Sequence, residues 1–196
     1  MATLMVDFIV SLDGYGAAEG WPSYWGLEGP EYLAWLNEDS LAADGLVYLM
    51  GANTYRIMSP WAGKNTDDAS LALDAARKVV FSSTITEPLS WNNTELVTGD
   101  AIAAVRKMKE DESLRLSTLG SVSLSRSLVA AGLVDRLRVV VFPVLTGKTG
   151  KEPVFEGYPD LSLELVESRS FDTGTQLLEY IPTVLDGPLP PGPTRA

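Results

Sequence analysis

Short apolar runs alternate with helix-like stretches through the first two-thirds of the 196-residue chain, and this alternation constrains the fold most strongly. The predicted strands are residues 1–11, 46–50, 78–82, 96–97 and 114–119. The predicted helices are residues 28–43, 51–58, a stretch within 61–76, 100–109 with Asp100 as its cap, and 121–131. Strands that alternate with helices predict a mostly parallel sheet covered by helices.

The pattern changes from Asp135 onward, where strand-like segments follow one another without a helix. These segments are residues 137–145, 161–171 and 176–181, and the turn Asp172-Thr173-Gly174 predicts a hairpin between the last two. We therefore expect an α/β fold with an antiparallel C-terminal edge. The length suits a single domain, which we assign to residues 1–185. Residues 186–196 are rich in proline, and we expect a disordered tail there.

The chain contains neither cysteine nor histidine, and this removes several chemistries. Disulfides, thiolate nucleophiles, Cys-ligated metals and every Ser-His or Cys-His triad are excluded. We expect no metal site, although a site made only of carboxylates stays open. The formal charge of −11 argues against nucleic acid as a partner. We find neither a signal peptide nor a membrane span, and we expect a cytoplasmic protein.

Small and hydroxylated residues follow three of the predicted strands. They are Gly51-Ala52-Asn53-Thr54, Ser82-Ser83-Thr84 and Gly120-Ser121-Val122-Ser123. Open α/β sheets bind ligands at the carboxyl ends of their strands, where glycine allows a backbone to approach a phosphate closely. Ordinary caps and turns use the same residue types. The pattern therefore leaves a nucleotide site and plain turns about equally open.

The order of these motifs resembles that of the dihydrofolate reductase-like superfamily. The residues that carry the resemblance are Ser11-Leu12-Asp13-Gly14, Gly51-x-x-Thr54-Tyr55, Ser82-Ser83-Thr84, Gly120-Ser121, Gly132-Leu133-Val134-Asp135-Arg136-Leu137 and Phe142-Pro143-Val144-Leu145-Thr146-Gly147. The likeness is greatest to the C-terminal reductase domain of the bifunctional riboflavin-biosynthesis deaminase-reductase and its stand-alone bacterial relatives, and it covers about residues 3–181. It implies a three-layer α/β/α fold and an NADPH-dependent reductase.

The resemblance also implies roles for individual residues. The implied cofactor residues are Gly51, Ala52 and Thr54 at the pyrophosphate, Ser82, Ser83 and Thr84 near the adenosine ribose and its 2′-phosphate, Gly120, Ser121, Val122 and Ser123 in a second phosphate loop, and Val10 beside the nicotinamide. Asp13, Trp25 and Tyr32 match positions on the substrate side.

Ala52 departs from the family pattern, because relatives carry an arginine there that helps to hold the cofactor phosphate. Losing this cation from an acidic chain is expected to weaken affinity for NADPH and preference over NADH. Two hypotheses follow. One is an oxidoreductase that transfers hydride from NADPH to a C=N or C=O group of a small heterocyclic or sugar-derived substrate. Its family precedent is 5-amino-6-(5-phosphoribosylamino)uracil reductase activity in riboflavin biosynthesis. The other is a non-catalytic binding protein that has lost cofactor affinity.

Hydride transfer also needs a proton, and without histidine the proton must come from Asp, Glu, Lys, Tyr or water. Asp13 is the first candidate and Glu31 the second, because a carboxyl in a semi-apolar cleft can have a raised pKa. Asp13 fits a turn residue before Gly14 equally well.

The expected partners are a small-molecule substrate and a second copy of the chain. Residues 137–145 are so apolar that an exposed strand edge there would favour association. Relatives commonly form dimers, so we expect a homodimer.

Overall fold

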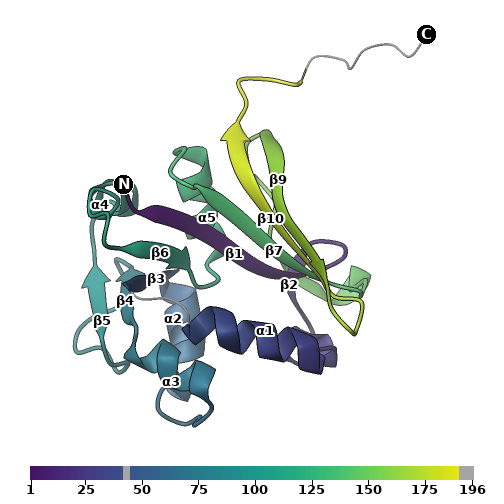
Figure 1. Ribbon diagram of the computed structural model, residues 1–196. Coiled ribbons are helices and arrows are strands. Elements are labelled where there is room, and N and C mark those ends of the chain that lie inside the picture. Colours follow the sequence, from purple (N-terminus) through teal and green to yellow (C-terminus); the bar gives the residue numbers. More distant parts are fainter. Residues whose placement is uncertain (42–44, 190–196) are drawn as a thin grey trace.

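The fold is built on an eight-stranded mixed sheet, seen in a computed structural model that describes residues 1–41 and 45–189 (Figure 1). The parallel strands are β1 (Thr3–Ser11), β3 (Leu46–Gly51), β4 (Arg77–Phe81), β5 (Thr94–Val97), β6 (Arg115–Thr118) and β7 (Arg136–Phe142). An antiparallel hairpin of β9 (Leu161–Ser170) and β10 (Gln176–Val184) joins them beside β7. The strand order is β5-β4-β3-β6-β1-β7-β10-β9. The predicted sheet and hairpin are confirmed.

Helices cover both faces of this sheet, which gives three layers (Figure 1). The helices are α1 (Pro30–Leu41), α2 (Ala52–Met58), α3 (Asp68–Ala75), α4 (Ala101–Met108) and α5 (Val122–Ala130). Val105 of α4 and Leu128 of α5 join a buried cluster with Val6 of β1 on one face. On the other face, Tyr32 of α1 and Tyr55 of α2 belong to two further buried clusters. Within the described residues, no helix has the length and apolarity needed to cross a membrane.

The alternation of side chains along β1 decides what each helical layer contacts. Leu4, Val6, Phe8 and Val10 are almost fully buried in the cluster that α4 and α5 cover. Because successive side chains of a strand point to opposite faces, Asp7 points to the face covered by α1. A charged residue therefore lies inside the molecule on that face.

Two polar side chains fix helix ends. Asp100 is the N-cap of α4, as predicted, and its carboxylate accepts two N–H groups of the first helical turn. Lys78 of β4 is buried, and its ammonium group donates to three carbonyl oxygens at the end of α3. Burial lowers the pKa of Lys78 to about 8.

The structure differs from the sequence prediction in two places. β2 (Tyr15–Ala18) and β8 (Gly150–Pro153) form a small antiparallel ribbon where the sequence suggested a loop and a turn. Apart from Tyr15, the two segments consist of glycine, alanine, lysine, glutamate and proline, which are depleted in strands, and their pairing partners are distant in the sequence. β7 is not an edge strand, because it lies between β1 and β10. Its apolar character reflects burial inside the sheet, whose two edge strands are β5 and β9.

Several predicted boundaries fall outside the described residues. The helix predicted to reach residue 43 is described up to Leu41, and residues 190–196 of the predicted tail are not described. The assignment of residues 1–185 to one domain stays a prediction.

Candidate active site at the carboxyl ends of the parallel strands

The three glycine- and hydroxyl-rich junctions lie side by side at one edge of the sheet. Gly51 ends β3 and pairs in register with Phe81, the last residue of β4. On its other side, β3 pairs with β6 as far as Thr118, just before the third junction. The junctions that follow β4, β3 and β6 are therefore neighbours in that order. The sequence-based expectation that they share one side of the sheet is met.

The junctions after β3 and β6 touch through the hydroxyl group of Ser121. The N–H of Gly51 donates to Ser121 Oγ over 2.7 Å, and Thr54 Oγ1 lies 2.7 Å from the same atom. Gly120 has a φ of +56°, and a Cβ there would lie 3.4 Å from Thr54 Oγ1. A side chain at position 120 would strain the backbone and crowd this contact.

The first turn of α5 keeps its backbone N–H groups free of capping side chains. Ser121 is the N-cap of α5, and its side chain makes no capping hydrogen bond because its hydroxyl is turned toward Gly51. Ser121 has a φ of +66°, a conformation that costs energy for a residue other than glycine. The N–H groups of Val122 and Ser123 lie in this turn and are suited to an anion.

The junction after β4 adds a positive charge that the sequence analysis missed. Ser82 Oγ accepts the N–H groups of Thr84 and Ile85, each over 3.0 Å. Arg56 of α2 donates from Nη2 to Thr84 Oγ1 over 2.7 Å. The signal was present in the sequence, because Arg56 is one helical turn beyond Ala52.

The sheet opens between β1 and β6 beside these junctions. Backbone pairing of the two strands extends from Thr3 to Met5 of β1 and stops there. The N–H of Asp7 then donates to the side-chain Oγ1 of Thr118 over 3.2 Å. β1 continues to Ser11, and on this side its second half, including Val10, pairs with no strand of the described chain.

Asp13 holds together two loops at the end of β1. Its carboxylate accepts a hydrogen bond from Ser11 Oγ over 2.6 Å. It also accepts hydrogen bonds from the N–H groups of Thr146 and Gly147, over 3.1 and 2.8 Å. The hydrogen bond from Ser11, followed by those from the backbone, lowers the pKa of Asp13 to about 2. This geometry supports the turn role that the sequence left open. Glu31 lies exposed in the first turn of α1.

Trp25 and Tyr32 come together in an aromatic cluster under α1. Their rings lie 5.5 and 5.4 Å from the ring of Phe142, and both side chains are buried. Neither Trp25 Nε1 nor Tyr32 Oη has a hydrogen-bond partner among the described residues. Both polar atoms are enclosed by protein, so Trp25 and Tyr32 form part of the core under α1 in this structure.

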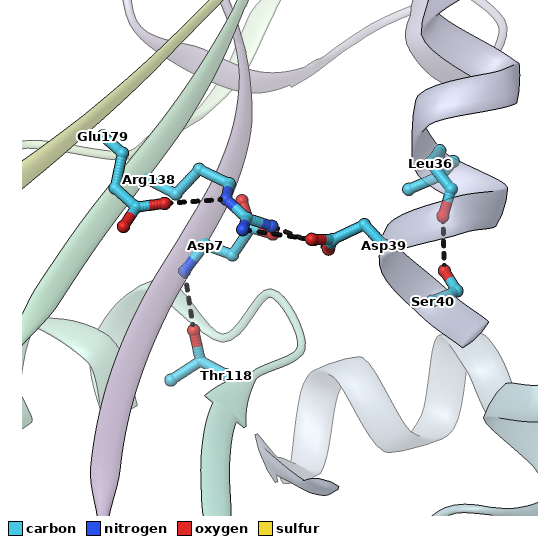
Figure 2. A network of polar contacts seen from close by, with 7 residues as sticks. All are labelled: Asp7, Leu36, Asp39, Ser40, Thr118, Arg138 and Glu179. Atoms are coloured by element: carbon cyan, nitrogen blue, oxygen red, sulfur yellow. Dashed lines mark hydrogen bonds and ion pairs between the residues drawn. The ribbon is translucent and has the colours of Figure 1, made fainter. Parts of the chain in front are cut away.

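A buried charged network lies on the same face of the sheet (Figure 2). Arg138 of β7 contacts Asp39 of α1 at 2.8 Å, Asp7 of β1 at 3.5 Å and Glu179 of β10 at 3.5 Å. Burial raises the pKa of Asp7 to about 6, although the charge of Arg138 opposes this shift. The sequence hint of this network was a charged residue inside each of two otherwise apolar strands, Asp7 in residues 3–11 and Arg138 in residues 136–142.

An open hollow of about 1010 Å³ lies away from this site. Its lining includes Arg77 at the start of β4, Thr94 at the start of β5 and Trp91 between them. These are the amino ends of the strands, opposite the three junctions. The hollow therefore contributes nothing to the candidate site.

Comparison with known proteins finds a family model and a relative that match most of the chain. The family model described as the RibD C-terminal domain matches residues 2–177. The uncharacterized protein YyaP of Bacillus subtilis (strain 168) is 25% identical over 184 residues, which cover 90% of this chain and 93% of YyaP.

Solved structures share the fold at low sequence identity. A putative riboflavin biosynthesis protein from Shewanella sp. PV-4 has a TM-score of 0.66 and 23% identity, over 93% of this chain and 99% of that one. The Thermotoga maritima diaminohydroxyphosphoribosylaminopyrimidine deaminase/5-amino-6-(5-phosphoribosylamino)uracil reductase has a TM-score of 0.62 and 15% identity, over 93% of this chain and 57% of that one. These matches confirm the dihydrofolate reductase-like fold.

Proposed function

This chain belongs to the RibD C-terminal domain family, and we propose that it is a reductase that uses NADPH. The observation that carries the proposal is the contact of Gly51 and Thr54 with Ser121. This contact joins two strand-end junctions into one cradle of uncharged hydrogen-bond donors. Such a cradle suits an anion in a chain whose own formal charge is −11.

The chemistry of the residues at the three junctions supports a dinucleotide as the ligand. Gly120 has a positive φ and keeps the cradle free of a side chain. The first turn of α5 offers N–H groups, and the junction after β4 offers hydroxyl groups and Arg56. The residues that would hold the cofactor are Gly51, Ala52, Thr54, Ser82, Ser83, Thr84, Gly120, Ser121, Val122 and Ser123, with Val10 beside its nicotinamide.

When bound, the cofactor would supply a hydride to a C=N or C=O group of a small heterocyclic or sugar-derived substrate. The 5-amino-6-(5-phosphoribosylamino)uracil reductase is the precedent. Trp25 and Tyr32 remain the residues proposed for the substrate side, where both rings pack around Phe142. The carboxyls proposed for proton delivery or relay stay Asp13 and Glu31. Because Asp13 holds its negative charge at neutral pH, it suits a relay better than a donor.

Two glycine variants test the proposal with matched backbone strain. Gly120 and Gly132 both have positive φ, +56° and +65°, but a Cβ at position 132 meets nothing within 4 Å. Both Gly120→Ala and Gly132→Ala should cost about 1 kcal/mol of stability. Only Gly120→Ala should weaken NADPH binding, measured by calorimetry. The proposal fails if the natural protein gives no saturable binding at millimolar NADPH.

Ala52 favours the second candidate function, a binding protein that has kept the fold and lost the cofactor. An uncharged residue at this position removes a cation from the cradle. Ala52→Arg separates the two candidates. If Ala52→Arg binds NADPH strongly and the natural chain binds none, the natural chain is not a working reductase.

A further inference from the structure

Arg56 brings an uncompensated positive charge to the strand-end junctions. It lies in the last turn of α2, its side chain is exposed, and its Nη2 donates to the hydroxyl of Thr84 over 2.7 Å. Among residues 1–41 and 45–189, no carboxylate forms an ion pair with Arg56. The contact that orients its guanidinium is therefore neutral, and the charge is left available to a bound anion.

The loop after β4 holds this guanidinium in a fixed place. Ser82 Oγ accepts the N–H groups of Thr84 and Ile85, which closes the loop into a tight turn. The hydroxyl oxygen of Thr84 accepts the hydrogen bond from Arg56, and Ser83, which precedes Thr84 in the chain, is exposed. An anion at this loop would meet one guanidinium and nearby hydroxyl groups, which are the groups that proteins use for phosphates.

The order of the strand ends assigns this loop to one end of a dinucleotide. Of the three junctions, the one after β4 lies farthest from β1. The β3–β6 cradle comes next along the sheet, and the opening between β6 and β1 follows it. This step rests on the proposed function, in which the reactive ring lies at that opening and the pyrophosphate in the cradle. The adenosine half then extends to the β4 junction and to Arg56.

Arg56 also lies on the helix face where the missing charge would have been. Ala52 and Arg56 are four residues apart on α2, and residues at this spacing are neighbours on one face of a helix. A long side chain at position 56 can therefore serve the same junctions that a cation at position 52 would serve.

We propose that Arg56 binds the 2′-phosphate of the adenosine ribose and makes the chain selective for NADPH over NADH. A phosphomonoester carries nearly two negative charges, and the planar guanidinium donates to two of its oxygens at once. Without this contact, the negative charge of the chain would disfavour the more highly charged dinucleotide. The alternative is that Arg56 only complements the C-terminal end of α2.

Fragments of the cofactor test this without relying on catalysis. Adenosine 2′,5′-bisphosphate and adenosine 5′-monophosphate differ only in the 2′-phosphate, and calorimetry gives the affinity of the natural protein for each. We expect the bisphosphate to bind at least about tenfold more tightly. Arg56→Gln should remove that preference and leave the monophosphate affinity unchanged, and Arg56→Lys should restore part of it. Arg106→Gln removes the same charge from an exposed position of α4 and should change neither affinity.

The outcomes separate the two proposals. The role of Arg56 is overturned if the natural protein binds both fragments equally, or if Arg56→Gln keeps the preference for the bisphosphate. In either case, the cofactor site itself is still supported if the protein binds NADPH and NADH. Failure of both fragments and both dinucleotides to bind overturns the cofactor site and the role of Arg56 together. Circular dichroism on each variant shows that Arg56→Gln remains folded.

Discussion

Arg138 of β7 donates two hydrogen bonds to Asp39 of α1, from Nη1 to Oδ2 over 2.8 Å and from Nη2 to Oδ1 over 3.2 Å (Figure 2). The two parallel contacts match the fork of the guanidinium to both carboxylate oxygens. Arg138 is almost fully buried, and Asp7 and Glu179 lie beside the same guanidinium. This one side chain therefore fastens α1 to the sheet and pairs with Asp7 and Asp39, whereas Glu179 also pairs with Arg136 over 3.2 Å.

Replacing Arg138 with methionine should destabilise the protein by up to about 3 kcal/mol, because the partly buried Asp7 and Asp39 lose their cation while Glu179 keeps Arg136. Arg138→Lys keeps the charge but not the fork, and should cost less. Urea unfolding gives both free energies. Arg106→Met, on an exposed position of α4, should change stability by about 0.5 kcal/mol or less. Equal stabilities of Arg138→Met and Arg106→Met would contradict this account of the network.

Asp7 should make the protein less stable as the pH rises from about 4 to about 6. Burial raises its pKa from the ordinary aspartate value of 3.8 to about 6, so in this range the folded state binds more protons than the unfolded state. Raising the pH therefore costs the folded state up to about 3 kcal/mol. Asp7→Asn removes this proton uptake.

The measurement is the difference in unfolding free energy between the natural protein and Asp7→Asn, from urea titrations across this pH range. Taking this difference removes the pH dependence that the other carboxyl groups contribute to both proteins. A difference that does not change with pH would show that Asp7 titrates with an ordinary pKa in the folded protein.

The sheet could be predicted from the sequence because its signals are local. Apolar runs bounded by glycine and caps such as Asp100 give strands and helices within a few residues of chain. The ribbon of β2 and β8 could not, because each strand is short and their partners are more than a hundred positions apart. The position of β7 inside the sheet depends equally on β10, which the order of the chain alone does not place.

The candidate site could be predicted from the sequence only where the type of a residue and its place after a strand were enough to suggest a role. Gly51 and Gly120 directly follow the predicted strands 46–50 and 114–119, and the hypothesis of a phosphate-binding cradle follows from that position. The buried network was missed because Arg138 and Asp39 are 99 positions apart and meet only when α1 packs on the sheet. The contact of Arg56 with Thr84 likewise needs α2 to lie beside the β4 loop.

Asp13 should stabilise the protein at neutral pH and lose this effect in acid. Its pKa is lowered to about 2 in the folded state, so its contribution is complete above the ordinary value of 3.8 and is lost as the pH falls toward 2. Since the side chain is exposed, we expect Asp13→Asn to cost about 1 kcal/mol at pH 7.

Thermal unfolding at neutral pH and at about pH 3 tests this, with Asp186→Asn as a control on a carboxylate outside the helices and strands. The destabilisation by Asp13→Asn should shrink in acid. If Asp13→Asn leaves stability unchanged at every pH, the hydrogen bonds to Thr146 and Gly147 do not hold the two loops together.

We propose that two copies of the chain associate through β9. This strand pairs only with β10 in the described chain, and it exposes Leu163, Leu165 and Val166 at 43%, 54% and 47%. An unpaired antiparallel edge with exposed apolar residues is suited to a second copy, because a two-fold axis can pair the strand with itself. Leu165→Lys places a charge in that contact and should convert a dimer to a monomer, measured by light scattering at micromolar concentration. Leu71→Lys, on exposed α3, should leave the mass unchanged. A monomeric mass for the natural protein would refute the proposal, and a dimeric Leu165→Lys would place the interface elsewhere.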